Sequence, residues 1–203
     1  MTQSDDELVR RLAGGDEPAF TALYRRHQGA IYRFALLMSG SAALAEDVTQ
    51  ETFLALLREA GRYDHGRGTV PAYLFGIARN HTLRRLRRDR SLTQLGDDVE
   101  ENDTAVFAQL VAADDPLRDC AREEVIQLVR QAVLALPPRY REVVVLCDFQ
   151  ELSYAEAAAA LGCAVGTVSS RLHRGHGLLL ERLRTRGGIA PAASHSDLLR
   201  SFS

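Results

Sequence analysis

Apolar residues recur at spacings of three and four through much of the first 90 residues. One series runs from Phe20 through Ile31 to Met38, which is the spacing that places side chains on one face of an α-helix. Gly40 is suited to end this helix, because glycine adopts a left-handed backbone readily, and Ser41 is suited to cap the next one. The pattern therefore predicts two successive amphipathic helices.

The second of these helices has two different faces. Its inner positions are predicted to be Leu44, Val48, Ala55 and Leu56. Its outer face carries the polar residues Glu46, Asp47, Gln50 and Glu51. A turn-rich stretch follows at residues 61–68, and Thr69 with Pro71 then opens a third helix that is expected to run to about Arg88.

An acidic stretch interrupts the helical pattern. Residues 97–115 carry seven acidic residues and no basic one. Such a segment buries too little apolar surface to fold alone. We therefore expect residues 91–115 to be a flexible acidic linker.

Helical spacing returns after Pro116. The predicted inward positions of this helix are Leu117, Ala121, Val125, Leu128, Ala132 and Leu136. Pro137 and Pro138 break it and begin another helix, with Tyr140, Val143, Val144 and Cys147 facing inward. The run Val143–Leu146 could form a strand, but its short length and helical neighbours favour a helix.

The segment from Leu152 to Arg186 carries the clearest local signal. Ser153 and Glu156 have the spacing of a capping box, and a run of alanines follows. Gly162 then begins a three-residue turn, after which a helix is expected to start near Val165. These features predict a helix-turn-helix. The fold class is all-α, with two small helical domains (residues 1–90 and 116–186) joined by the linker and followed by a disordered tail at 187–203.

The second helix of this motif carries hydroxyl and basic side chains on its outer and flanking faces. They are Thr167, Ser169, Ser170, Arg171, His173 and Arg174. Arginine bonds guanine edges, and serine reaches base edges or phosphates, so this helix favours binding in the major groove of duplex DNA. The alternative is an ordinary helical hairpin with a solvated arginine face.

A second basic surface lies at the end of the third helix. Six arginines and one aspartate occur between Arg79 and Arg90. They could bind phosphates or simply be solvated, and composition does not separate the two. The nearby rings of Tyr63, Tyr73 and Phe75 suit stacking on unpaired bases, or packing in the core.

Composition excludes several function classes. The formal net charge is −2, and all 25 basic residues are arginine. The three cysteines form no C-x-x-C pair, and no signal peptide, membrane-length apolar run, phosphate loop or nucleophile motif occurs. His173 and His176 could share a metal, but contact with phosphate or solvent is favoured. We expect a cytoplasmic protein that is not an enzyme, has no catalytic residues, inserts in no membrane, and needs no metal or cofactor.

Two stretches carry a family resemblance. AEDVTQETFLALLR (45–58) and PAYLFGIARNHTLRRLRR (71–88) resemble the first conserved domain of bacterial RNA polymerase sigma factors. LPPRYREVVVLCDFQELSYAEAAAALGCAVGTVSSRLHRGHGLLLERL (136–183) resembles their last domain. The short chain resembles the extracytoplasmic-function class, which implies promoter-specific initiation of transcription with core polymerase.

The resemblance also implies roles for residues. Asp47, Gln50 and Glu51 match the face that docks on the clamp helices of the β′ subunit, and the last domain of the family meets the β flap. The −10 element would be melted and read by Tyr63, Asn80, Arg84, Arg87 and Arg88. The −35 duplex would be read by Thr167, Ser169, Ser170, Arg171, His173 and Arg174. Members of this class are usually held inactive by an anti-sigma factor, which implies such a partner here.

The chain departs from the family pattern at several positions. Tyr73 stands where tryptophan is frequent, Arg84 where aspartate is frequent, and Ser169 where a basic residue is common. Gly175 and His176 replace the usual alanine and arginine. We expect the DNA preference to differ at these positions. The alternative function is a stand-alone helix-turn-helix regulator that does not join polymerase, which would leave the Asp47, Gln50 and Glu51 face unused.

Overall fold

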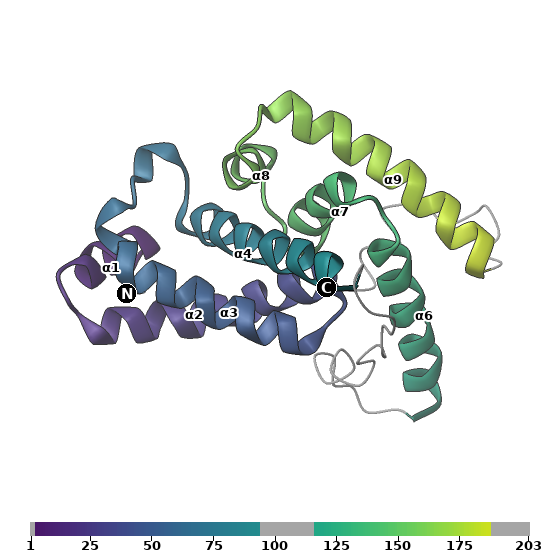
Figure 1. The fold of residues 1–203 in the computed structure, drawn as a ribbon, viewed down its shortest axis with the longest axis horizontal. Coiled ribbons are helices and arrows are strands. Elements are labelled where there is room, and N and C mark those ends of the chain that lie inside the picture. The colour runs from purple at the N-terminus through teal and green to yellow at the C-terminus, as the bar shows by residue number, and fades with distance from the viewer. Residues whose placement is uncertain (1–2, 94–115, 188–203) are drawn as a thin grey trace.

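The computed structural model describes residues 3–93 and 116–187, and the described part is helical without strands, which confirms the all-α class (Figure 1). Most of the predicted linker and almost all of the predicted tail lie outside these residues. The helix ending at Thr93 extends three residues past the expected start of the linker. The elements in chain order are α1 (Asp5–Ala13), α2 (Glu17–Ser39), α3 (Ala42–Glu59), η1 (Ala60–Arg62), η2 (His65–Arg67), α4 (Val70–Thr93), α6 (Pro116–Leu134), α7 (Pro138–Val144), η3 (Val145–Phe149), α8 (Tyr154–Leu161) and α9 (Val165–Gly187).

The helix boundaries of the N-terminal half follow from capping side chains. Gly40 ends α2 with a left-handed backbone at φ 79°, and the Ser41 hydroxyl accepts the Leu44 amide at the start of α3, as predicted. A separate first helix was not predicted. Ser4 caps it by accepting the Glu7 amide, and Asp16 caps α2 by accepting the Ala19 amide. These caps turn the chain between α1 and α2 within a few residues.

The N-terminal core lies between α2, α3 and α4. Its largest fully buried side chains include Leu23, Ile31, Phe34, Leu56 and Leu74. Phe75 is 4% exposed, and its ring centroid lies 5.4 Å from that of Phe34 in an edge-to-face contact. Phe75 therefore belongs to the core and not to a base-stacking surface.

The C-terminal half confirms the predicted helix-turn-helix. Ser153 and Glu156 form the capping box, Gly162 adopts φ 64°, and the turn of residues 162–164 separates α8 from α9. The run that begins at Val143 is helical, and a π-helical turn, η3, follows α7.

The inward stripe predicted for α6 is wrong at Val125. That side chain is 42% exposed, whereas Ile126 and Val129 are buried. Arg130 is 2% exposed, so α6 turns a charged residue inward as well. The predicted inward positions Ala132 and Leu136 are buried, so the prediction fails at Val125 and holds at the end of the series.

The two halves of the described chain pack against each other. Helix α8 lies on α4, while α6, α7 and η3 contact α2 (Figure 1). The close approach of α8 is possible because the facing residues are small: a Cβ on Gly68 would lie 3.3 Å from that of Ala159, and one on Gly76 would lie 3.4 Å from the Ala160 carbonyl oxygen.

Two arginines of the C-terminal half bind the end of α2. The Arg141 Nη1 donates to the Met38 carbonyl at 2.5 Å, and the Arg130 Nη2 donates to the Gly40 carbonyl at 3.1 Å. The last carbonyls of a helix carry partial negative charge, and the last turn of α2 has no basic residue of its own. These arginines therefore supply the cations that the α2 C-terminus lacks.

Candidate nucleic-acid and polymerase surfaces

The outer face of α9 begins immediately after the helix-turn-helix turn. Ser169, Ser170, His173 and Arg174 are exposed there, while Val168 and Leu172 are buried beneath them, as predicted. Thr167 and Arg171 are half-buried at the edges of this face. A short row of donors and acceptors at a helix N-terminus, above an apolar seam, has the form of a helix that enters a major groove.

Helix α7 orients two arginines of this row. The Arg171 Nη1 lies 3.8 Å from a carboxylate oxygen of the buried Glu142. Arg174 bonds the Tyr140 hydroxyl and, with Arg139 also near that ring, holds the pKa of Tyr140 below its ordinary value. These contacts hold both guanidinium groups against side chains of α7.

Gly175 and His176 do not belong to the exposed row. Gly175 is buried, and a Cβ there would lie 2.8 Å from Val144 Cγ2 on α7. The His176 Nε2 lies 2.8 Å from an Asp148 carboxylate oxygen on η3. Gly175 therefore packs against α7 and His176 pairs with η3, and the expected effect of these two positions on the DNA preference stays a prediction.

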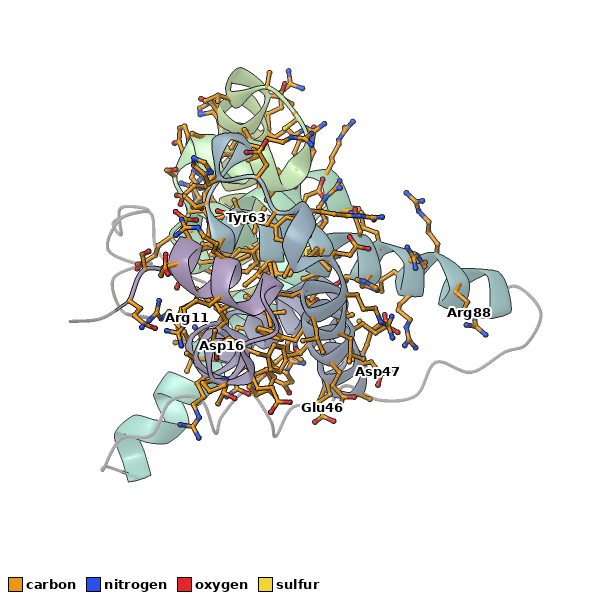
Figure 2. The ribbon with its side chains drawn as sticks, turned by 90° about the vertical axis from the view of Figure 1, so that its left-hand side faces the viewer. Arg11, Asp16, Glu46, Asp47, Tyr63 and Arg88 are labelled. Carbon is orange, nitrogen blue, oxygen red and sulfur yellow. The ribbon has the colours of Figure 1, made fainter. Side chains whose placement is uncertain are left out.

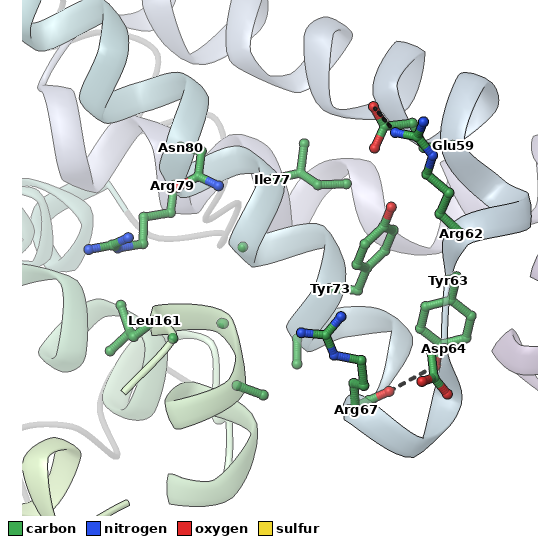
Figure 3. Close-up of a pocket in the computed structure, with 16 residues that line it drawn as sticks. Glu59, Arg62, Tyr63, Asp64, Arg67, Tyr73, Ile77, Arg79, Asn80 and Leu161 are labelled. Carbon is green, nitrogen blue, oxygen red and sulfur yellow. Dashed lines mark hydrogen bonds and ion pairs between the residues drawn. The ribbon is translucent and has the colours of Figure 1, made fainter. Parts of the chain in front are cut away.

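A cavity of about 660 Å³ lies beside the other candidate DNA surface (Figure 3). One wall is the loop of residues 62–68 and the exposed side of α4, including Tyr73 and Asn80; the other is residues 159–162 of α8 and its turn. Tyr73 is half-buried, and its ring centroid lies 5.4 Å from that of Tyr63. This pair of rings, with the Asn80 amide nearby, offers stacking and hydrogen bonding to an unpaired base.

Tyr63 is held more firmly than the sequence suggests. Its hydroxyl oxygen lies 2.6 Å from an Asp6 carboxylate oxygen and 3.0 Å from the Gly68 carbonyl oxygen. Burial and the adjacent Asp6 raise the pKa of Tyr63. Its hydroxyl is thus committed to internal hydrogen bonds, which leaves its ring to face the cavity.

The predicted arginines of α4 follow along the same helix. Arg84, Arg87 and Arg88 are exposed, and Arg88 lies towards the far end of α4 (Figure 2). Together with Asn80 they form a basic track that leads away from the cavity. The spacing of these side chains suits contact with successive phosphates of a nucleic-acid backbone. Such contacts neutralise charge and do not depend on the base sequence.

The polar face of α3 points away from the core. Glu46, Asp47 and Gln50 are exposed, and Figure 2 shows the first two projecting from the helix. Asp47 and Glu51 are paired with α4: Arg85 Nη1 lies 3.2 Å from Asp47, and Arg85 Nη2 lies 2.7 Å from Glu51.

Two apolar residues extend this face and were missed by the sequence reasoning. Leu54 and Leu57 are 47% and 51% exposed on the same helix. Their spacing of four and seven residues from Gln50 would have placed them on its outer face. An exposed apolar patch with a polar border is typical of a protein-binding surface.

Within residues 3–93 and 116–187, no group of three or more His, Cys, Asp or Glu side chains is arranged to hold a metal ion. In the same part of the chain, no helix combines the length and apolarity that crossing a membrane requires.

Comparison with known proteins identifies the family. Residues 23–92 match the family model described as Sigma-70 region 2, and residues 126–176 match the one described as Sigma-70, region 4. The chain is 31% identical over 178 residues to ECF RNA polymerase sigma factor SigW of Bacillus subtilis, covering 87% of this chain and 95% of that protein. The chain is an ECF RNA polymerase sigma factor. As such, it directs promoter-specific initiation of transcription.

Other similar proteins include a second ECF sigma factor and two solved structures. ECF RNA polymerase sigma factor SigE of Mycolicibacterium smegmatis is 38% identical over 176 residues, which cover 84% of this chain and 65% of that protein. Among solved structures, the sigma factor RpoE of Bartonella quintana, in complex with the anti-sigma factor NepR, is 27% identical with a TM-score of 0.66, over 82% of this chain and 98% of that chain. CnrH in complex with the cytosolic domain of CnrY is 26% identical with a TM-score of 0.65, over 91% of this chain and 100% of that chain.

The family boundaries coincide with the structural halves of this sigma factor. Region 2 contains most of α2 with α3 and α4, and therefore one wall of the cavity, the basic track and the α3 face. Region 4 contains α7, α8 and the first half of α9, hence the exposed row. The helix α1 lies before the matched region 2, although Asp6 contacts its loop.

Proposed function

We propose that this sigma factor reads the −35 element through Ser169, Ser170, His173 and Arg174 of α9. The observation that carries this proposal is their joint exposure at the start of the second helix of a helix-turn-helix. Thr167 and Arg171 border the row and assist it. Arg182 and Arg184 lie further along α9 and contribute positive charge towards the DNA backbone.

The −10 element is read at the cavity beside α4. An unpaired base stacks against the Tyr63 and Tyr73 rings and bonds the Asn80 amide, and Arg84, Arg87 and Arg88 neutralise the adjoining phosphates. Taking a base out of the stack costs a few kcal/mol, which these contacts offset.

Core polymerase binds the α3 face formed by Asp47, Gln50, Glu51, Leu54 and Leu57. The apolar pair supplies buried area and the polar residues supply orientation. The clamp helices of the β′ subunit are the proposed partner of this face, and the β flap is the proposed partner of region 4.

The two DNA-binding halves separate when the promoter is bound. By their names, the two promoter elements lie about 25 base pairs apart, or roughly 85 Å of duplex. A compact chain of this length has a radius of gyration of only about 17 Å. Because α8 packs on α4 and closes one side of the cavity, binding at both elements requires these two helices to separate, and residues 91–115 are the segment of chain that joins the two halves.

Other assignments follow from the family. An anti-sigma factor is a proposed partner, as NepR is for RpoE and CnrY for CnrH. The chain acts as a binding subunit of polymerase and catalyses no reaction itself. Its place of action is the cytoplasm, where polymerase meets the chromosome.

Transcription in vitro with core polymerase, followed by sequencing of start sites, tests this function. The chain is expected to select promoters that share −10 and −35 motifs. Ser169→Ala and His173→Ala should alter base preference at −35 but not at −10, whereas Glu181→Gln, an exposed control on the same helix, should alter neither. Absence of promoter-selective initiation would refute the proposal.

A further inference from the structure

The loop between α3 and α4 is attached to a helix that lies 57 residues earlier in the chain. The Tyr63 hydroxyl donates to Asp6 of α1, with 2.6 Å between the oxygens, and also lies 3.0 Å from the Gly68 carbonyl oxygen. One side chain thus links the two ends of the loop and connects it to α1.

The other hydrogen bonds of the loop are local. The Gly66 amide donates to the Asp64 carboxylate at 2.9 Å, and the Arg67 amide donates to the Asp64 carbonyl at 3.0 Å. Arg62, Asp64, His65 and Arg67 are exposed, whereas Tyr63 is half-buried. These local bonds shape the turn but do not fix where the loop lies relative to the helices.

Helix α1 is itself firmly placed. Leu8, Val9 and Leu12 are buried, and Asp5 pairs with Arg26 and, at 2.8 Å, with His27 of α2. The adjacent residue Asp6 points instead to Tyr63. Of the two neighbouring carboxylates, Asp5 therefore binds α2 and Asp6 binds the loop. A hydrogen bond to a carboxylate is stronger than one between neutral groups, which makes Asp6 the dominant acceptor.

Tyr63 lines both hollows at this end of the molecule. It contributes to the 660 Å³ cavity beside α4 and to a smaller one of 250 Å³ that α1 residues, including Asp6 and Val9, line from the other side. A change at the hydroxyl would therefore alter the wall that an unpaired base would meet. Thr69, which bonds Glu156 of α8 at 2.9 Å, loses that support when the two halves separate, whereas the Asp6 contact lies within one half and remains.

We propose that Asp6 is a positioning residue for −10 recognition: through the Tyr63 hydroxyl it holds the loop of residues 61–68 in the shape that selects the base. This inference rests on the proposed function of the cavity. Asp6 contacts no DNA. Base preference at −10 thus depends on a helix outside the matched region 2.

The test compares Tyr63→Phe, Asp6→Ala and the double variant in holoenzyme reconstituted with core polymerase. The templates carry a fixed −35 element and a randomised −10 element. Tyr63→Phe removes the donor and keeps the ring, Asp6→Ala removes the acceptor, and each is expected to weaken −10 base discrimination about fivefold. The double variant should be no weaker than either single one, because both remove the same bond. Glu7→Gln, a neighbouring acid on α1, is the matched control and should leave discrimination unchanged.

Two further readouts separate positioning from loss of structure. Affinity for core polymerase and base preference at −35 should stay as in the unmodified chain. Additive effects of the two changes, an inert Asp6→Ala, or an equal loss at every template together with weaker core binding would each overturn the proposal.

Hydrogen exchange in the free chain tests whether the Asp6–Tyr63 hydrogen bond holds the loop in place, and it needs no promoter DNA. Exchange of the amides of residues 61–68 should accelerate about fivefold in Tyr63→Phe and Asp6→Ala but not in Glu7→Gln. If the unmodified chain fails to direct transcription while this pattern appears, the proposed function fails and the attachment of the loop stands. If exchange is the same in all variants, the attachment itself is refuted.

Discussion

Arg79 of α4 and Glu142 of α7 form an ion pair in which the Arg79 Nε lies 2.6 Å from a Glu142 oxygen. The Glu142 side chain is only 5% exposed, and Arg171 of α9 approaches the same carboxylate at 3.8 Å. One buried carboxylate therefore touches both helices that we assign to DNA. Arg79 of region 2 and Arg171 of region 4 therefore both offset the charge of this carboxylate.

Replacing Glu142 by glutamine should destabilise the folded chain. The change leaves Arg79 and Arg171 without a counter-charge in a poorly hydrated place, and we expect a loss of about 2 kcal/mol in the free energy of unfolding. Urea unfolding followed by circular dichroism measures it. Glu17→Gln, at an exposed position of α2, is the control and should change stability by less than about 0.5 kcal/mol.

A wedge between α8 and α4 should open the molecule. Ala160 is buried against Gly76, so Ala160→Gln forces the helices apart, whereas Ala43→Gln on the exposed side of α3 does not. Small-angle X-ray scattering should show a larger radius of gyration for the first variant only. Because promoter binding requires separation, Ala160→Gln should keep or increase affinity for promoter DNA in holoenzyme. A loss of promoter affinity with normal folding would mean that the packed arrangement is the active one.

The apolar part of the α3 face should dominate binding to core polymerase. Leu54→Ser and Leu57→Ser are each expected to weaken the affinity about tenfold, since an exposed leucine that becomes buried contributes about 1.5 kcal/mol or more. Val125→Ser on α6 removes an equally exposed apolar side chain elsewhere and serves as the control. Competition for fluorescently labelled core polymerase gives the affinities, and equal values for all three variants would exclude this face.

Acid should weaken the capping box of α8. Hydrogen bonds from the Ser153 hydroxyl and then from its backbone amide lower the pKa of Glu156, and burial opposes them. A lowered pKa stabilises the fold above the pH at which a glutamate of the unfolded chain ionises, about 4.3, and this contribution is lost as the pH falls through the folded value. Glu156→Gln should therefore flatten the fall in stability below about pH 4.3, measured by thermal unfolding between pH 3 and pH 6. An unchanged pH profile would contradict this account.

Much of the fold was predictable because short-range chemistry sets it. Gly40, Ser41, Ser153, Glu156 and Gly162 mark helix ends by side-chain and backbone properties that act within four residues. The exposed row of α9 followed from the same periodicity. Those elements depend on their own sequence more than on distant neighbours.

The packing of the two halves was not predictable in this way. Gly68, Gly76 and Ala160 enable the approach of α8 to α4 by having almost no side chain, and small residues in a sequence carry no sign of what lies opposite them. Arg130 is a second example: a charged residue on a helix is expected to be solvated, and the sequence does not show that the Gly40 carbonyl at the end of α2 will accept a hydrogen bond from it.

The close approach of α9 to α7 has an evolutionary consequence. With only 2.8 Å between a Cβ on Gly175 and the Val144 methyl, a side chain at position 175 needs a smaller one at position 144. The two positions should therefore change together among descendants of this chain. Position 175 would then change with the interior of its own domain, while the promoter would constrain the exposed residues that precede it on α9, from Ser169 to Arg174.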